Sequence, residues 1–142
     1  MKRYLLDTSA ILALRDDEAG ADDVADILQR GLRRENRCMV CFITLMEVLY
    51  RVWKDEGEEA GRLAYEQCLA LPLVIRHEDE ELLQKAAELK ANYPLSLADA
   101  WIAAAAILEG AVLVHKDPEF EAVQSEQFKL PYRKPALPPD KR

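Results

Sequence analysis

The hydrophobic pattern changes at Asp7 within the segment Lys2-Arg-Tyr-Leu-Leu-Asp-Thr-Ser-Ala-Ile-Leu-Ala-Leu14, and this change indicates the fold class. Residues 2 to 6 form a short apolar run, which is typical of a buried strand. Residues 8 to 16 then repeat apolar side chains at the spacing of a helix that packs through one face. A strand is therefore predicted to pass directly into a helix at Asp7.

The same alternation of strand and helix continues along the chain. Strands are predicted at residues 38 to 43, 72 to 76 and 111 to 115, with an edge strand at 128 to 132. Helices are predicted at residues 21 to 35, 45 to 54, 57 to 71, 80 to 91 and 96 to 109, and a short one follows Asp117-Pro118. Strands separated by helices predict an α/β fold, in which helices cover both faces of a parallel β-sheet.

The length of 142 residues suits one compact domain, which we expect to span residues 1 to 132. Residues 133 to 142 are rich in proline and charge, and we expect them to form a frayed tail. Half of the chain is apolar and 32% is charged, which excludes a fibrous or disordered protein. The longest apolar run, residues 100 to 108, is too short to cross a bilayer, so we expect a cytoplasmic protein.

The net charge of −7 argues against nonspecific binding to nucleic acid, because affinity for phosphate comes mainly from lysine and arginine. The basic residues, however, gather at positions 30 to 37 and 129 to 142. Some of the acids are also candidates for a metal site, described below, where a bound cation would offset their charge. Since local potential matters more than the total, a nucleic-acid substrate is not excluded.

Three cysteines include one CxxC pair, Cys38 and Cys41, whose spacing can mark zinc or redox sites. Here the pair lies in a predicted strand, where positions three apart point to opposite faces. No second CxxC or histidine pair completes a zinc site. We therefore interpret both, together with Cys68, as structural.

Four acidic residues stand where helices are predicted to begin: Asp7, Glu47, Asp99 and Asp117. Each has a purely structural explanation, because the helix dipole favours acids near N-termini. Residues 44 to 47 and 96 to 99 both fit a capping box, and Asp7 and Asp117 could be simple N-caps. Taken singly, each acid is explained at least as well by capping as by function.

Taken together, the four acids indicate a metal site. Three follow predicted strands and the fourth opens an apolar helix, and ligands bind beyond the carboxyl ends of parallel strands. Two carboxylates about 5 Å apart repel each other by roughly 3 kcal/mol at an effective dielectric constant of about 20. Their convergence therefore suggests a cation, and oxygen ligands without histidine or cysteine favour Mg²⁺ or Mn²⁺ over zinc. Such ions can activate water and stabilise the leaving oxygen of a phosphodiester.

Four segments resemble the four acidic blocks of PIN domains, in order: Leu5-Leu-Asp-Thr-Ser-Ala-Ile-Leu12, Ile43-Thr-Leu-Met-Glu-Val-Leu-Tyr50, Leu95-Ser-Leu-Ala-Asp-Ala-Trp-Ile-Ala103 and Leu113-Val-His-Lys-Asp-Pro-Glu-Phe120. The resemblance spans about residues 2 to 130 and is nearest to the VapC-like toxins of bacterial and archaeal toxin–antitoxin pairs. It implies a three-layer α/β/α fold, Mg²⁺-dependent ribonuclease activity, a homodimer, and inhibition by an antitoxin protein.

The resemblance implies that four acids bind the metal directly or through water: Asp7, Glu47, Asp99 and Asp117. It also implies that Ser9 supports Asp7 by hydrogen bonding. Thr8 is interpreted as a helix cap. His115 departs from the family pattern, because many relatives carry threonine or serine two residues before the last acid. It either supports that acid in a changed way or packs at the end of a strand.

The sequence thus predicts a Mg²⁺- or Mn²⁺-dependent endoribonuclease, the toxin of a type II toxin–antitoxin pair. Its predicted partners are unpaired RNA, an antitoxin and a second copy of the chain. One alternative is a noncatalytic PIN-fold module that binds RNA or protein. Another is a phosphotransfer enzyme with Asp7 as nucleophile, although Ser9 stands where such enzymes carry a second acid.

Two sets of side chains are assigned to binding. We expect the apolar Leu49, Tyr50 and Trp53 to be either dimer contacts or core. Basic side chains near the acids are expected to position the RNA: Arg51, Lys54 and Lys116. His77, which has no partner in the sequence pattern, is interpreted as a surface loop residue.

Overall fold

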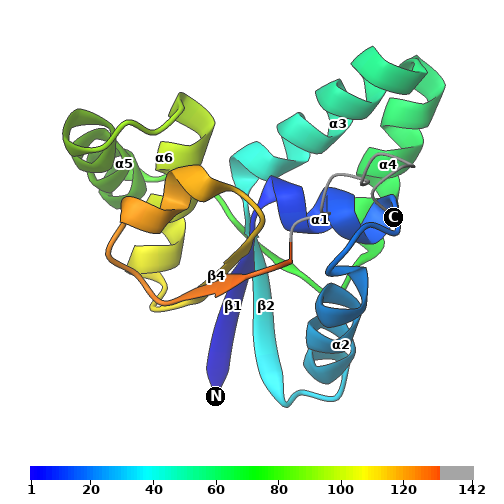
Figure 1. Cartoon of the computed structure of the whole chain (residues 1–142), viewed down its shortest axis with the longest axis horizontal. Helices are drawn as coiled ribbons and strands as arrows, with labels where there is room; N and C mark the ends of the chain where they lie inside the picture. Colours follow the sequence, from blue (N-terminus) through cyan, green and yellow to red (C-terminus); the bar gives the residue numbers. More distant parts are fainter. Residues whose placement is uncertain (132–142) are drawn as a thin grey trace, which may run out of the picture.

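The computed structural model describes residues 1–131, and within them five strands form one fully parallel sheet (Figure 1). The strands are β1 (Lys2–Leu6), β2 (Asn36–Cys41), β3 (Val74–Arg76), β4 (Val112–His115) and β5 (Gln127–Lys129). They lie in the order β3-β2-β1-β4-β5, so the first strand is central and β5 forms an edge, as predicted. The predicted tail, residues 133 to 142, and the end of the predicted edge strand at residue 132 lie outside the described residues.

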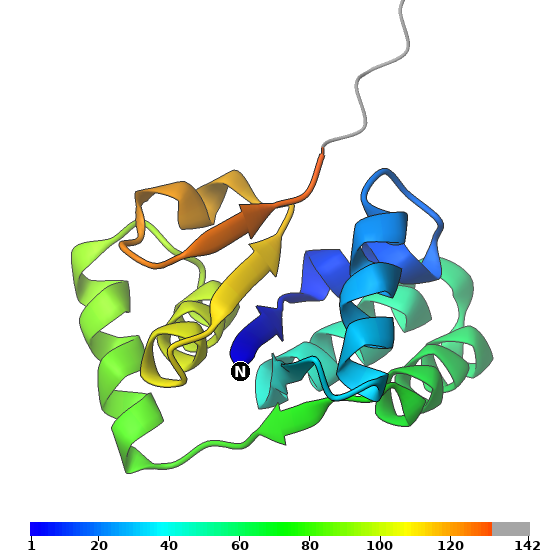
Figure 2. The same cartoon turned by 90° about the horizontal axis from the view of Figure 1, so that it is seen from below.

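The helices of the same part of the chain are α1 (Thr8–Arg15), α2 (Ala21–Leu32), α3 (Phe42–Glu56), α4 (Glu58–Ala70), α5 (Glu80–Asn92), α6 (Leu97–Leu108) and the 3₁₀ helix η1 (Pro118–Ala122). Figures 1 and 2 show α1 to α4 on one side of the sheet and α5 and α6 on the other. The predicted three-layer α/β/α fold is confirmed. Among the described residues, no helix combines the length and the apolarity that a membrane span requires.

Adjacent residues of the central strands face opposite helical layers. Leu5 and Leu113 pack with the residues of α5 and α6, whereas Leu6 and Val114 pack with those of α1 to α4. Side chains alternate in this way along any strand, and here both faces are covered. This double burial explains why the strands appear in the sequence as continuous apolar runs.

Helix α6 lies against the sheet, as its apolar sequence predicts. Ala103 to Ala106 are completely buried, and their small side chains let the helix lie close to the strands. Leu97, in the first turn, is exposed and departs from the predicted apolar packing. Gly110, at φ +60°, follows the helix in the left-handed conformation that commonly ends helices.

Helix α3 begins at Phe42, earlier than predicted, because β2 already ends at Cys41. Phe42 is apolar and packs against the α6 side of the core, so a hydrophobic pattern alone could not separate strand from helix here. Cys41 is the N-cap and makes no side-chain capping bond, while Thr44 is buried inside the helix. The capping box predicted for residues 44 to 47 is therefore wrong, and Glu47 stands on the second turn of α3.

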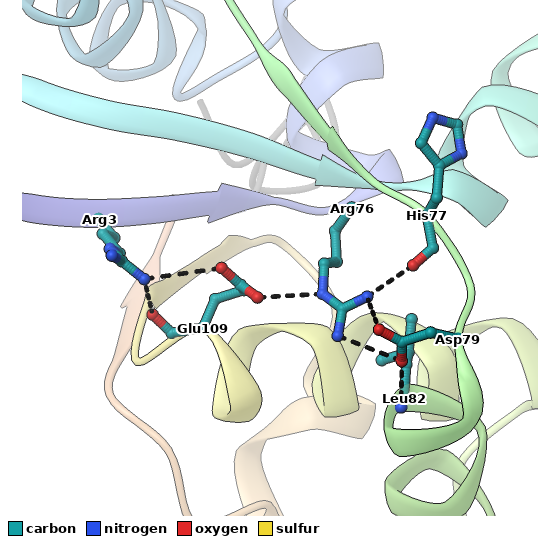
Figure 3. A network of polar contacts seen from close by, with 6 residues as sticks. All are labelled: Arg3, Arg76, His77, Asp79, Leu82 and Glu109. Atoms are coloured by element: carbon teal, nitrogen blue, oxygen red, sulfur yellow. Dashed lines mark hydrogen bonds and ion pairs between the residues drawn. The ribbon is translucent and has the colours of Figure 1, made fainter.

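The guanidinium of Arg76 connects β3 with both helices of the α5–α6 layer (Figure 3). Its Nε donates to Glu109 Oε2 at 3.0 Å, just beyond α6. Its Nη1 donates to Asp79 Oδ2 at 3.0 Å and to the carbonyl oxygen of His77 at 2.6 Å. Asp79 is also the N-cap of α5, and Arg3 of β1 donates to the Glu109 carbonyl at 3.2 Å. His77 is an exposed loop residue, as predicted.

All three cysteines of the sequence are buried and free, which confirms their structural interpretation. Burial raises the pKa of each thiol, Cys38, Cys41 and Cys68, to about 11. The protonated thiol is therefore favoured at all three positions at neutral pH.

Candidate metal centre

The predicted acids lie at the carboxyl end of the sheet, and β1 and β2 run toward the top of Figure 1. Asp7 follows β1, Asp117 follows β4, Asp99 stands in the first turn of α6, and Glu47 stands on α3. Asp7 is 2% exposed and Asp99 is 8% exposed, and Glu47 is also buried. Burying so many carboxylates is costly unless hydrogen bonds, protons or a cation compensate the charge.

Asp7 is the N-cap of α1, as predicted. Its carboxylate accepts from Ala10 N at 2.9 Å and from Ser9 Oγ, which lies 2.7 Å from Oδ1 and 2.9 Å from Oδ2. The predicted hydrogen bond from Ser9 is therefore present. Ser9 Oγ also accepts from Lys116 N at 2.9 Å, which ties the first acid to the segment after β4. Burial raises the pKa of Asp7 to about 7, against the opposing effect of the bonds from Ser9 and Ala10.

Thr8 orients Glu47 and does not cap a helix, so its predicted role is wrong. Asp7 takes the capping position, and the buried Thr8 hydroxyl donates to Glu47 Oε1 at 2.6 Å. Thr8 Oγ1 also lies 3.1 Å from Thr44 Oγ1. A hydroxyl has a single hydrogen, which goes to the carboxylate, so Thr44 donates to Thr8 in turn. On its other side Glu47 Oε2 lies 3.4 Å from Arg51 Nη2.

Asp99 occupies only half of its predicted capping box. Ser96 Oγ accepts from Asp99 N at 3.2 Å, which is the expected N-cap bond of α6. The Ser96 amide, however, donates to Glu119 Oε1 at 3.2 Å. In a capping box the Asp99 carboxylate would accept from the Ser96 amide, but here Glu119 of η1 accepts that bond. The Asp99 carboxylate lies instead with those of Asp117 and Glu119.

Asp99, Asp117 and Glu119 form a cluster in which one carboxylate oxygen from each lies within 4.8 Å of the others. Burial of Asp99, followed by its hydrogen bonds with Glu119 and Asp117, raises the pKa of Asp99 well above the usual range. In the metal-free cluster the protonated form of Asp99 is therefore favoured. Asp7 and Glu47 are not part of this group, although Asp117 is close enough to Asp7 to help raise its pKa.

Glu119 is the member of the cluster that the sequence pattern did not indicate. Asp117 Oδ1 accepts from Glu119 N at 2.9 Å, so Asp117 is the N-cap of η1, as predicted. The Asp117-Pro-Glu119 sequence carries the signal, because a tight turn that starts at proline keeps two acids two positions apart near each other.

The donor set fits a hard divalent cation. Oxygens on opposite sides of such an ion are roughly 4 to 5 Å apart, which matches the separation within the cluster. All three donors are carboxylates, and histidine and cysteine contribute nothing, which disfavours zinc. Asp99, Asp117 and Glu119 could therefore hold the ion, and it would replace the shared proton.

Two of the three bases predicted to position RNA are exposed on α3. Arg51 is beside Glu47, and Lys54 lies one turn further along the helix. Lys116 does not fit the prediction. Its side chain is 10% exposed, and its Nζ donates to the carbonyl of Ala19 at 2.9 Å and lies 3.7 Å from Glu18 Oε1.

The apolar side chains of α3 are only partly core. Tyr50 is 45% exposed and Trp53 is 40% exposed, whereas Leu49 is half-buried. The guanidinium of Arg62, from α4, lies 5.2 Å from the centroid of the Trp53 ring. Gly61 permits this close crossing of α3 and α4, because a Cβ there would lie 2.8 Å from the Leu49 carbonyl oxygen.

The family model of the PIN domain matches residues 4–126, and the chain belongs to this family. The match covers β2, β3, β4 and most of β1, stops just before β5, and includes all four predicted acids and Glu119. A search of curated protein sequences gives no significant match.

Several solved structures share the fold. VapBC2 from Rickettsia felis, bound to a DNA fragment from its promoter, has a TM-score of 0.74 and 22% identity over 91% of this chain and 99% of that chain. DNA-bound VapBC from Salmonella typhimurium has a TM-score of 0.71 and 21% identity over 91% and 98%. VapC20 from Mycobacterium tuberculosis, described as a sarcin–ricin loop cleaving toxin, has a TM-score of 0.63 and 20% identity over 86% and 95%. At identities this low, the structural similarity establishes a common fold and nothing further.

Proposed function

We propose that this protein is a Mg²⁺- or Mn²⁺-dependent endoribonuclease and the toxin of a type II toxin–antitoxin pair. The observation that carries the proposal is the group of Asp99, Asp117 and Glu119 carboxylates within 4.8 Å of one another at the carboxyl end of the sheet. Membership of the PIN family and the similarity of fold to VapC toxins support it.

We assign the metal to Asp99, Asp117 and Glu119, with Asp7 and Glu47 binding it directly or through water. A bound divalent ion supplies a more acidic water and stabilises the leaving oxygen of the phosphodiester. Asp7, fixed by Ser9 and the Ala10 amide, orients the attacking water and accepts its proton. The products are a 5′-phosphate and a 3′-hydroxyl, since the 2′-hydroxyl of the RNA does not act as nucleophile.

The proposed substrate is single-stranded or looped RNA. To reach the acids at the carboxyl end of the sheet, the RNA backbone must be separated from its stacked bases, and unstacked segments expose their backbone. Arg51 and Lys54 are the proposed phosphate contacts, since both are exposed on the helix that carries Glu47. Cleavage should therefore weaken as the salt concentration rises.

The proposed partners are an antitoxin and a second copy of the chain. Neighbouring folds were solved as VapBC complexes, which supports an antitoxin. The half-exposed Tyr50 and Trp53 support a dimer contact on α3. We also propose that residues 1 to 132 act as one PIN-like domain, and that the protein works in the cytoplasm.

The proposal is tested by incubating the purified protein with mixed cellular RNA, with Mg²⁺ or Mn²⁺ and with excess EDTA. Wild type should cut only with the metal, and Asp7→Asn and Asp99→Asn should each lose most of the activity. Asp26→Asn is the matched control, because Asp26 is exposed on α2, away from the acidic cluster, and pairs with Arg30. Cleavage that persists in EDTA, or in both site variants, would refute the proposal. RNA binding without cleavage would favour a noncatalytic PIN-fold module.

A further inference from the structure

His115 and Gln127 form a buried polar pair between neighbouring strands β4 and β5. His115 is completely buried at the end of β4, and its Nε2 lies 2.8 Å from Gln127 Oε1. Its other ring nitrogen, Nδ1, accepts from Asp117 N at 3.0 Å. Gln127 Nε2 donates to the carbonyl oxygens of Phe120 at 2.8 Å and Val123 at 3.0 Å.

These partners fix the protons of the pair. A backbone amide can only donate, so His115 Nδ1 is the acceptor nitrogen and carries no hydrogen. Gln127 uses its amide nitrogen on two carbonyls, so its oxygen faces the ring and accepts from His115 Nε2–H. The imidazole is therefore neutral and in a single tautomer, with every polar atom of both side chains used.

The bonds hold both ends of one turn, residues 117 to 123. His115 holds the amide at its start, and Gln127 holds carbonyls at its middle and end. The His115 ring also contacts the Phe120 ring, with centroids 5.0 Å apart. Asp117 and Glu119 both belong to this turn, and their carboxylates meet Asp99.

We propose that His115 and Gln127 are positioning residues, which hold the 117–123 turn so that Asp117 and Glu119 meet Asp99 around the metal. This inference rests on the proposed metal site. Neither side chain is one of the proposed ligands, and both act through the turn that carries Asp117 and Glu119. Partners of this kind commonly change metal affinity by about 10-fold to 100-fold when they are removed.

The pair can be dissected with substitutions of matched shape. His115→Phe keeps a ring in the same space and loses both hydrogen bonds. His115→Asn keeps an acceptor, because an asparagine oxygen readily accepts from the amide two residues ahead. Gln127→Met keeps the length of the side chain and loses all three of its bonds.

The experiment measures Mn²⁺ affinity by calorimetric titration of the full chain, at a fixed pH above neutrality. His115→Phe and Gln127→Met should each weaken the affinity about 10-fold or more, and His115→Asn should recover most of the loss. Leu28→Ala is the control for stability alone, because Leu28 is buried in the core on the other face of the sheet. It should lower the melting temperature and leave the Mn²⁺ affinity unchanged.

Asp117→Asn separates this inference from the proposed function. If it loses Mn²⁺ binding while His115→Phe and Gln127→Met keep wild-type affinity, the metal site stands and the positioning role is refuted. If Asp117→Asn itself binds Mn²⁺ like wild type, the proposed metal site fails. If His115→Phe does not fold, the other two variants test the inference. Gln127→Met must then lose Mn²⁺ affinity, and His115→Asn must keep it.

Discussion

Thr8 donates its hydroxyl hydrogen to Glu47 Oε1 at 2.6 Å, and this bond joins residues 39 positions apart. It connects the start of α1 with the second turn of α3, so the β1–α1 and β2–α3 junctions are held together at the carboxyl end of the sheet. Because Glu47 is buried, the orientation of its carboxylate depends on these few donors. The relationship makes Thr8 a supporting residue of the candidate site.

Replacing Thr8 with valine should destabilise the fold by about 1 to 3 kcal/mol, because a buried carboxylate loses a donor without a change of side-chain shape. Thr8→Ser keeps the hydroxyl and should lose much less. Chemical denaturation of the metal-free proteins measures both values. Equal stability of wild type and Thr8→Val would show that Glu47 does not need this bond.

The stability of the metal-free protein should fall as the pH rises. Burial raises the pKa of Asp7 from 3.8 to about 7 and raises that of Asp99 as well, so the folded protein retains protons that the unfolded chain releases. This contribution is complete below pH 3.8 and is lost as the pH rises through about 7. Melting curves across that range measure the slope, and Asp99→Asn should flatten it. A melting temperature that rises over the same range would contradict the assignment.

Mg²⁺ or Mn²⁺ should raise the melting temperature, because the ion binds the folded state and relieves repulsion absent from the unfolded chain. Glu119→Gln should reduce this gain, by about 1.4 kcal/mol for each tenfold loss of affinity. Glu121→Gln is the matched control in the same turn, since Glu121 is exposed and pairs with Lys129. Identical gains in both variants would exclude Glu119 from the site.

The half-exposed Tyr50 and Trp53 predict a homodimer through α3. Wild type should sediment as a dimer at tens of micromolar, and Tyr50→Ser combined with Trp53→Ser should sediment as a monomer. Leu69→Ser serves as a control, because Leu69 is an exposed apolar residue of α4. A monomeric wild type at that concentration would count against the dimer.

The fold and the position of the acids at the carboxyl end of the sheet could be predicted because the sequence signals for them are local. The apolar run before Asp7 and the helical spacing after it depend only on neighbouring residues, and so does the N-cap geometry of Asp7 and Asp117. The apolar sequence of α6 similarly requires burial wherever the helix lies. Alternation of such elements then constrained the sheet to be parallel.

The remaining features depend on contacts between distant segments, which no local pattern specifies. Thr8 and Ser9 are both hydroxyl residues at a helix start, yet only the tertiary structure sends one to Glu47 and the other to Asp7. Lys116 is predicted to contact RNA because it is a basic residue near the acids, but its ammonium donates to the Ala19 carbonyl oxygen. Glu119 likewise lies beside Asp99 only because η1 packs against α6, which the local sequence does not specify.

Anomalous scattering from a crystal grown or soaked with Mn²⁺ reports whether these carboxylates hold a divalent cation. The predicted result is an anomalous peak within coordination distance of Asp99 and Asp117, with Glu119 beside it, and its loss in crystals of Asp99→Asn. A well-diffracting Mn²⁺ crystal with no peak at this cluster, or with a peak that persists in Asp99→Asn, would contradict the account.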